Sequence, residues 1–185
     1  PPFLYRNERR EYLNNKIIPP GTLLDKSADP LDENSYKKFI QNDFAPDLMF
    51  REILSFVDKN KNRPFLLMWT TTIPHVPLQA PQRWIDYYKT KFGDEQPYVG
   101  ESGYYPVRYP HATYAAMISY LDDQIGLLVE YLKRNDLYDN TLIVFTSDNG
   151  PTFNGGSDSP WFRSAGPFKC EYGWGKGSLH EGGIR

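Results

Sequence analysis

Asp148 and Asn149 are the adjacent residues of this chain best suited to holding a metal ion. They follow an apolar run, Thr141–Thr146, that is typical of a fully buried β-strand, and Gly150 comes directly after them. Ligands of open α/β sheets are bound by the loops beyond the carboxyl ends of the strands. A carboxylate beside a carboxamide offers hard oxygen ligands, which suit Ca²⁺ or Mg²⁺ better than zinc. Because Asp-Asn-Gly is also typical of a plain turn, these residues alone leave both interpretations open.

His75 and Lys176 are two further side chains whose setting suits chemistry on an anion. His75 lies between Pro74 and Pro77 after an apolar segment, and the prolines restrict the backbone so that the imidazole can be aimed. Lys176 carries a compact point charge, which suits a tetrahedral anion. Taken alone, however, a single histidine after a strand is more often structural, and a single lysine is usually a solvated surface charge.

The segments that position these residues alternate between helical and strand patterns. A helix is predicted from Asp43, because Pro46 suits a first turn and the following apolar residues have helical spacing. Shorter and longer helices are predicted over residues 81–92 and 114–134. Apolar residues at 65–70 and 142–147 predict buried strands. A strand, a helix and a strand with this spacing form a crossover unit, so the sheet should contain parallel strands.

Four sequence blocks, in this order along the chain, resemble the type I sulfatases, the arylsulfatase-like branch of the alkaline phosphatase superfamily. The first is Arg63–Trp69 followed by Pro74–Leu78, which is similar to the family's strand and histidine loop. Tyr120–Gly126 is similar to its long helix, and Phe145–Gly150 to its second metal-binding block. Lys176–Gly183 resembles its sulfate-contacting lysine block. A weaker likeness extends towards the start of the chain.

The resemblance implies a fold, a reaction and roles for the candidate residues. The fold is expected to be α/β, with a mixed, largely parallel sheet flanked by helices, as in alkaline phosphatase. The reaction is hydrolysis of sulfate monoesters on a carbohydrate. His75 and Lys176 are expected to contact the sulfate and help to protonate the leaving oxygen, while Asp148 and Asn149 hold Ca²⁺, with Mg²⁺ the weaker alternative.

The family's nucleophile block is missing from this sequence. The resemblance implies Cys or Ser followed by x-Pro-x-Arg, whose first residue is oxidised to formylglycine, but Cys170 is the single cysteine and is followed by Glu-Tyr-Gly-Trp. We therefore expect the chain to be an internal part of a sulfatase catalytic domain, with the sheet incomplete, and to be inactive when expressed alone. Residues 1–42 are predicted to be mostly loop, 43–150 an α/β crossover region and 151–185 an active-site loop region.

Three alternative functions stay open at this point. A phosphatase or phosphodiesterase of the same superfamily would typically place a histidine after the aspartate, where this chain has Asn149. A non-catalytic carbohydrate-binding remnant is compatible with the missing nucleophile. A plain α/β structural domain is the third. Of the other histidines, His111 precedes the long helix and could cap it or border a site, with the structural role favoured.

Composition limits the partners. A net charge of −2 and a pI near 5.9 give no electrostatic footprint for nucleic acid. No apolar run approaches the roughly 20 residues of a membrane span. Aromatic residues make up 16% of the chain, which suits stacking on sugar faces as well as core packing. The expected partner is a sulfated small molecule or saccharide. A periplasmic or secreted location follows from the resemblance alone, and the oligomeric state does not follow from the sequence.

Overall fold

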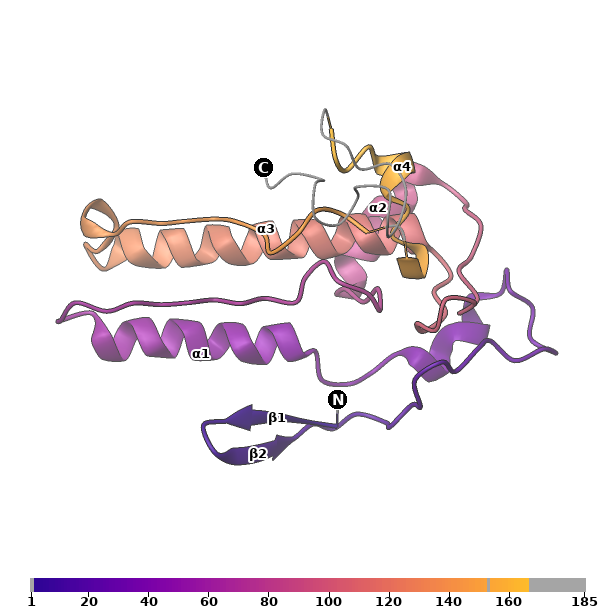
Figure 1. The fold of residues 1–185 in the computed structure, drawn as a ribbon, viewed down its shortest axis with the longest axis horizontal. Helices are drawn as coiled ribbons and strands as arrows, with labels where there is room; N and C mark the ends of the chain where they lie inside the picture. The colour runs from indigo at the N-terminus through magenta and orange to yellow at the C-terminus, as the bar shows by residue number, and fades with distance from the viewer. Residues whose placement is uncertain (1, 153, 167–185) are drawn as a thin grey trace.

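Three long helices form the main secondary structure of the computed structural model, which describes residues 2–152 and 154–166 (Figure 1). They are α1 (Ala45–Asn60), α2 (Gln82–Phe92) and α3 (Pro110–Arg134). A proline lies in the first turn of α1 and of α3, where its missing N–H costs no hydrogen bond. The three predicted helices are confirmed, with α3 starting at Pro110 instead of Tyr114. None of the described helices is both long and apolar enough to cross a membrane.

Short elements join the long helices. Strands β1 (Phe3–Arg6) and β2 (Arg9–Tyr12) pair antiparallel around a turn in which Asn7 has a φ of 55°. The other short elements are η1 (Glu33–Phe39), η2 (Tyr138–Asn140), η3 (Asn154–Gly156) and α4 (Ser159–Phe162). Residues 1–42, predicted to be mostly loop, thus include a hairpin and a short helix.

The predicted strands over 65–70 and 142–147 are extended but unpaired among the described residues, where the one sheet consists of β1 and β2. Among the described residues these segments are not buried as predicted, because Leu66 is 88% exposed and Leu142 is 89% exposed. A strand of a parallel sheet becomes buried only when strands pair with it and layers cover both its faces. Segment 65–70 is covered on one side, by α1, where Phe65 meets Phe56 at 5.8 Å between ring centroids.

The course of the chain nevertheless repeats the helix-then-extended order that the sequence predicts. Figure 1 shows that α1 and α3 run in the same direction and that each is followed by an extended segment returning along it. The two extended segments therefore run in the same direction as well. Their ends carry the two candidate site regions, so the topology sends both regions towards the same end of the molecule.

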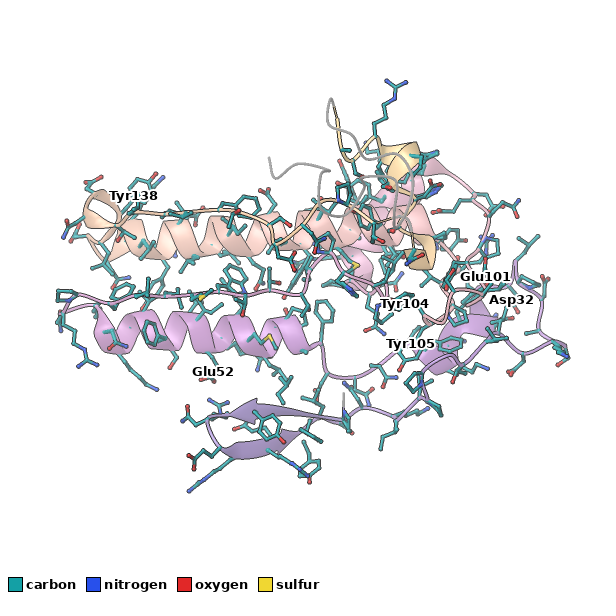
Figure 2. The ribbon with its side chains drawn as sticks, viewed as in Figure 1. Asp32, Glu52, Glu101, Tyr104, Tyr105 and Tyr138 are labelled. Atoms are coloured by element: carbon teal, nitrogen blue, oxygen red, sulfur yellow. The ribbon has the colours of Figure 1, made fainter. Side chains whose placement is uncertain are left out.

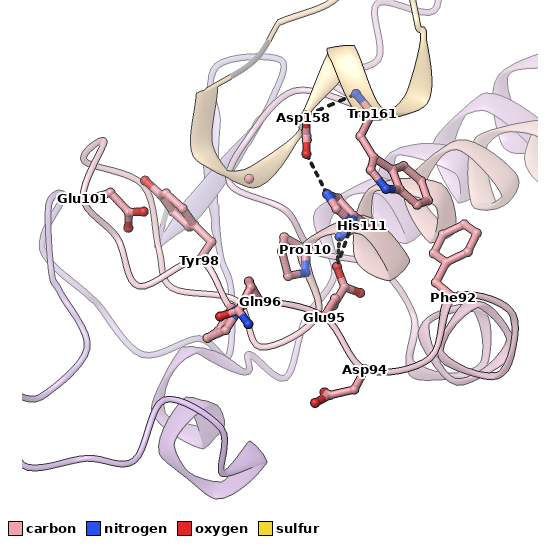
Figure 3. Close-up of a pocket in the computed structure, with 12 residues that line it drawn as sticks. Phe92, Asp94, Glu95, Gln96, Tyr98, Glu101, Pro110, His111, Asp158 and Trp161 are labelled. Carbon is pink, nitrogen blue, oxygen red and sulfur yellow. Dashed lines mark hydrogen bonds and ion pairs between the residues drawn. The ribbon is translucent and has the colours of Figure 1, made fainter.

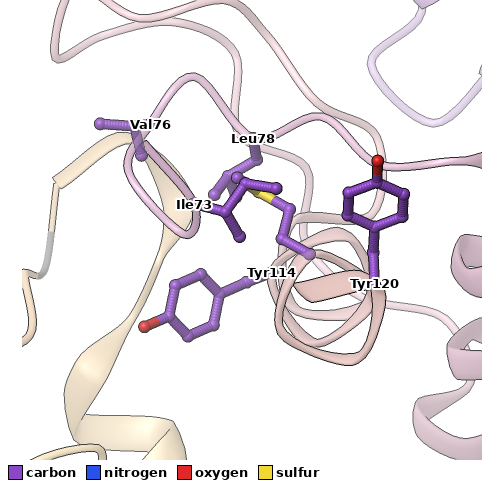
Figure 4. Close-up of a cluster of buried hydrophobic side chains, with 6 residues drawn as sticks. Ile73, Val76, Leu78, Tyr114 and Tyr120 are labelled. Carbon is purple, nitrogen blue, oxygen red and sulfur yellow. The ribbon is translucent and has the colours of Figure 1, made fainter. Parts of the chain in front are cut away.

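The core lies between the start of α3 and the loop that carries His75. Its central residues come from that loop and from one side of α3 (Figure 4): Ile73, Val76, Leu78, Tyr114, Met117 and Tyr120. Helix α2 packs against α3 from another side. The apolar spacing predicts a buried stripe on α3 that runs from Ile118 to Leu132, and this stripe is buried only in part. Leu132 is 4% exposed, whereas Ile118 is 45% exposed.

Two tyrosines of α3 donate to aspartates of α1, and they provide a matched test of this packing. Tyr120, which is 2% exposed, donates to Asp47 at 2.6 Å, whereas the Tyr131 hydroxyl donates to Asp58 at 3.0 Å on the surface. We expect Tyr120→Phe to lower the free energy of unfolding by about 1.5–3 kcal/mol, as for a buried hydrogen bond to a charged group. Tyr131→Phe should cost less than about 0.5 kcal/mol. Urea unfolding of both variants measures the difference, and equal losses would contradict the assigned packing.

Candidate active site

The His75 loop is anchored on both sides by the core. Ile73, Val76 and Leu78 are all buried, while the His75 side chain between them is exposed. The backbone N–H of His75 donates to the Thr72 carbonyl at 2.7 Å, which closes the turn. The peptide bonds Ile73–Pro74 and Val76–Pro77 are cis. The loop therefore presents one imidazole to solvent from a well-packed base.

The orientation of the His75 ring is fixed by its neighbour. Nδ1 lies 2.5 Å from the Val76 carbonyl oxygen, which can only accept, so Nδ1 carries the hydrogen. Nε2 is then left to accept a proton in the neutral ring or to donate one in the charged ring. The Tyr104 ring lies 6.2 Å from the imidazole, edge to face, and borders it on one side. This arrangement suits an imidazole that exchanges a proton with a bound molecule.

Asp148 and Asn149 lie exposed in the turn that ends the second extended segment. The Ser147 hydroxyl donates to the Asn149 carbonyl at 2.8 Å, and the Asn149 side-chain amide donates to the Gly150 carbonyl at 2.8 Å. Because the NH₂ group of Asn149 is used within the turn, its Oδ1 atom is the one that it can present outward. The turn interpretation and the ligand interpretation are therefore compatible.

The oxygen chemistry of this pair fits a hard cation, although two side chains are too few for a complete shell. Ca²⁺ takes about six to eight oxygen ligands. Among residues 2–152 and 154–166, no group of three or more His, Cys, Asp or Glu side chains could hold a metal ion. Asp148 and Asn149 can thus supply part of a coordination shell, and the described residues do not supply the rest.

Lys176, the other predicted sulfate-contacting residue, lies outside the described residues. The hydrogen bonds of His75 and Asn149 stay within their own loops, so these contacts do not join the two segments. What the fold does bring together is the His75 loop and the chain just after Asn149. That junction is made by Gly155, Val76 and Tyr104.

Gly155 lies in close contact with the His75 loop. It has a φ of 62°, and a Cβ there would lie 2.7 Å from Cγ1 of Val76 and 3.0 Å from Cδ2 of Tyr104. Real Cβ atoms do not come so close to other atoms, and a left-handed backbone already favours glycine. The loop after Asn149 can therefore pack on the His75 loop only because this residue has no side chain.

A polar network that the sequence did not predict surrounds His111 at the start of α3 (Figure 3). Its Nε2 lies 2.9 Å from Asp158 Oδ2, and its Nδ1 lies 3.4 Å from Glu95 Oε2. The Glu95 carboxylate also accepts from the backbone N–H groups of His111 at 2.6 Å and Ala112 at 3.0 Å. Glu95 is therefore the cap of α3, and His111 links that cap to α4.

The aromatic contacts around this network hold α4 in place. The Trp161 ring stacks on His111 with 4.3 Å between centroids and 15° between planes. Phe162 packs against Tyr114 at 5.0 Å, and burial raises the pKa of the Tyr114 phenol. The sequence signals were His111 before a helix and the long Gly- and Tyr-rich loop over 93–110, since loops of that length are often functional. These signals did not indicate that His111 would contact Glu95, Asp158 and Trp161.

The Sulfatase family model matches residues 5–185. Among curated relatives, the chain is 29% identical to N-acetylgalactosamine-6-sulfatase of Homo sapiens over 75% of this chain and 22% of the relative. It is 34% identical to Arylsulfatase J of Mus musculus over 73% of this chain and 18% of the relative. It is 31% identical to N-acetylgalactosamine-6-O-sulfatase of Bacteroides thetaiotaomicron over 75% of this chain and 24% of the relative.

Solved structures agree with the family match. The fold is similar to Ps i-CgsB in complex with k-i-k-neocarrahexaose, with a TM-score of 0.53 and 37% identity over 75% of this chain and 26% of that one. A second structure of Ps i-CgsB gives a TM-score of 0.54 and 38% identity. The chain belongs to the Sulfatase family, as the four sequence blocks predicted. It spans 18 to 32% of the length of the first curated relatives that it matches.

The junction at Gly155 can be tested with a matched pair of glycines. Gly103 also has a positive φ, of 86°, but a Cβ there would meet nothing within 4 Å. We expect Gly103→Ala to cost about 1 kcal/mol of stability from backbone strain alone. Gly155→Ala should cost at least about 2 kcal/mol more, because it adds a clash to the same strain. Thermal unfolding of both variants in the full-length protein checks this, and equal losses would show that the two loops are not in contact.

Proposed function

We propose that the full-length protein hydrolyses sulfate monoesters carried by a carbohydrate. The observation that carries this proposal is that the Sulfatase match over residues 5–185 includes His75, Asp148, Asn149 and Lys176 together. Relatives named for N-acetylgalactosamine 6-sulfate, and a similar structure bound to neocarrahexaose, support a saccharide as the carrier. Asn149 in place of a histidine favours a single hard cation, and with it sulfate over phosphate.

The proposed reaction needs three contributions from this part of the protein. The charge on the sulfate oxygens must be offset, the ester must be oriented, and the leaving alkoxide must be protonated. Lys176 offsets charge on the sulfate. His75, with Nδ1 committed to Val76, delivers its proton from Nε2 to the leaving oxygen. Asp148 and Asn149 would hold a Ca²⁺ ion, which supplies further positive charge beside the sulfate when it is bound.

The same proposal assigns the two extended segments to a larger sheet. Residues 65–70 and 142–147 run in the same direction along their helices, as parallel strands of one sheet would (Figure 1). In segment 65–70, partly buried and exposed residues alternate, which is typical of a strand with one face on a helix. The exposed apolar side chains of both segments fit strands that pair and pack on further chain. An alkaline-phosphatase-like sheet would then bring both site loops to one edge.

His75→Ala tests the proposed proton transfer. In the full-length protein, we expect the variant to lower kcat by about 10²–10⁴-fold for sugar sulfates, whose leaving oxygens are basic. For nitrophenyl sulfate the loss should be much smaller, because that leaving group needs little protonation. The measurement is kcat for a series of sulfate esters with leaving groups of increasing pKa, plotted for wild type and variant.

Tyr131→Phe is the control for this experiment. It removes an exposed hydroxyl in the last turns of α3, which donates to Asp58 and lies away from the His75 loop. We expect the dependence of kcat on leaving-group pKa to stay as in the wild type. An equal loss in His75→Ala for all esters would show that His75 acts on binding and not as the acid.

A further inference from the structure

A cavity of about 510 Å³ opens beside His111, between the loop over 93–110, the start of α3 and the η3–α4 segment (Figure 3). Its volume lies in the range of small-ligand pockets, about 300–1,000 Å³. Its walls are held by the contacts already described: the cap from Glu95 and the bond from His111 to Asp158. The cavity is therefore preformed. The question is which chemistry would fill it.

The charge of the lining excludes a sulfated ligand. Asp94, Glu95, Glu101 and Asp158 line the cavity, and the described lining residues include no lysine or arginine. A sulfate group would enter a negative field and would meet no fixed cation to replace its hydration. This is the opposite of the charge that the proposed sulfate position requires.

The partners of these carboxylates also argue against an organic cation. Asp94 is paired with Arg108, and Asp158 with His111. Glu95 is 6% exposed and its oxygens accept from two backbone N–H groups at the positive end of α3. Asp94 is thus paired with a cation, and Glu95 and Asp158 already have hydrogen-bonding partners, so these three carboxylates are left as acceptors for hydroxyl groups. An uncharged ligand rich in hydroxyls fits this lining best.

Aromatic rings supply the apolar part of the lining. Phe92, Tyr98 and Trp161 border the cavity, and Trp161 is 50% exposed. Flat aromatic faces beside hydrogen-bonding groups fit a sugar ring, which has apolar C–H faces and a polar rim. The three rings and the partnered carboxylates together fit an uncharged sugar unit.

The cavity is separated from the His75 loop by the thickness of one loop. Gly155 lies against Val76 and Tyr104 on the His75 side. The next residue, Gly156, lines the cavity, and a Cβ there would lie 2.9 Å from Pro110 and 3.2 Å from Tyr98. A saccharide chain whose sulfate is at His75 could therefore continue over this glycine pair.

We propose that the cavity beside His111 is a subsite for an unsulfated sugar unit of the saccharide whose sulfated unit is hydrolysed at His75. This inference rests on the proposed function for the link to His75, but the sugar-binding property of the cavity can be tested separately. Under this proposal the protein selects saccharides in which a sulfated unit has an uncharged neighbour. Chains that carry a sulfate on both units are disfavoured, because a second sulfate would meet the Glu101 carboxylate and no lysine or arginine in the lining.

The first experiment measures binding without turnover. Full-length protein is titrated with a panel of unsulfated hexose and N-acetylhexosamine disaccharides while ligand saturation transfer is recorded by NMR, with tetramethylammonium as the organic-cation probe. We expect at least one disaccharide to bind and Trp161→Ala to weaken it by about tenfold, the loss of one stacked ring. Tyr138→Ala, an exposed aromatic change at the far end of α3 (Figure 2), should leave binding unchanged. Binding of tetramethylammonium alone, or of no panel member, overturns the proposal.

The second experiment tests selection during turnover. We expect Trp161→Ala to lower the ratio of kcat/KM for a sulfated disaccharide to kcat/KM for nitrophenyl sulfate by about tenfold. Glu101→Lys should raise the relative kcat/KM for a disaccharide sulfated on both units, because it places a cation in the lining. An unchanged ratio in both variants overturns the proposal. If no sulfate ester is hydrolysed, the proposed function fails, while the titration still decides whether the cavity binds sugar.

Discussion

Replacing Asp148 with alanine in the full-length protein should abolish sulfate ester hydrolysis and Ca²⁺ binding together. Asp148 is exposed at the end of an extended segment and has Asn149 beside it as the second oxygen donor. Removing the carboxylate takes away the negative charge that would hold the cation. A ligand at about 100 times its Kd stabilises the folded protein by about 2.7 kcal/mol. The Ca²⁺-dependent increase in Tm should therefore be present in the wild type and absent from Asp148→Ala.

Asp139→Ala is the matched control, since Asp139 is an exposed aspartate in η2, before the same extended segment. It should keep both the Tm response to Ca²⁺ and the activity. Mg²⁺ should give a smaller response than Ca²⁺ in the wild type. If Asp148→Ala loses activity but its Tm still rises with Ca²⁺, residues other than Asp148 bind the ion. A variant that keeps both properties would refute the metal assignment.

The helices were predictable because their signals are local. Pro46 occupies the first turn of α1, where its fixed φ and missing N–H are tolerated. Apolar spacing marked the buried side of α1, where Phe50, Ile53 and Val57 all lie in the core. On α3 the spacing marked Leu132, which is buried, but it did not mark Tyr114 and Met117, which pack against the His75 loop. The spacing of apolar residues within a helix does not determine which other segments will pack against it.

Strand predictions depend on residues far away in the sequence. The apolar run at 142–147 predicts an extended backbone, and the chain is extended there, but burial needs partners on each side. Val144 is 76% exposed among the described residues. The β1–β2 hairpin was missed for the converse reason. Most of its residues are polar or exposed, so they show no apolar alternation. Its turn depends on a positive φ at Asn7, and the sequence around Asn7 is not one of the common hairpin-turn sequences.

The candidate residues of the active site came from motifs, whereas the cavity beside His111 could not. His75 and Asp148 lie in short sequence motifs, which can be recognised without knowing which distant residues pack beside them. The cavity joins Glu95, His111 and Asp158 from three segments, and no local pattern marks that meeting. Gly155 and Gly156 are typical of a loop, which the sequence predicts. That each must be glycine because other residues pack against it is known only from the structure.

Lys176→Ala should lower kcat for sulfate esters by about 10²–10³-fold. A well-placed donor to charge that develops in the transition state contributes about 3–4 kcal/mol. Lys176→Arg should restore little, because a planar guanidinium cannot take the place of a compact ammonium beside a tetrahedral anion. Lys169→Ala, a lysine change in the same stretch of sequence, is the control and should leave kcat unchanged. A loss confined to KM would assign Lys176 to ground-state binding.

The combination of Lys176→Ala with His75→Ala tests whether both side chains serve one sulfate. If they act on the same sulfate, the fold-loss of kcat in the double variant should be smaller than the product of the two single fold-losses. Once one side chain is gone, the other stabilises the transition state less, so removing it costs less. If the losses multiply, the two residues act independently. Since the two residues lie far apart in sequence, a coupled result would also require the loops after the two extended segments to share one edge, which is the topology that a parallel sheet imposes.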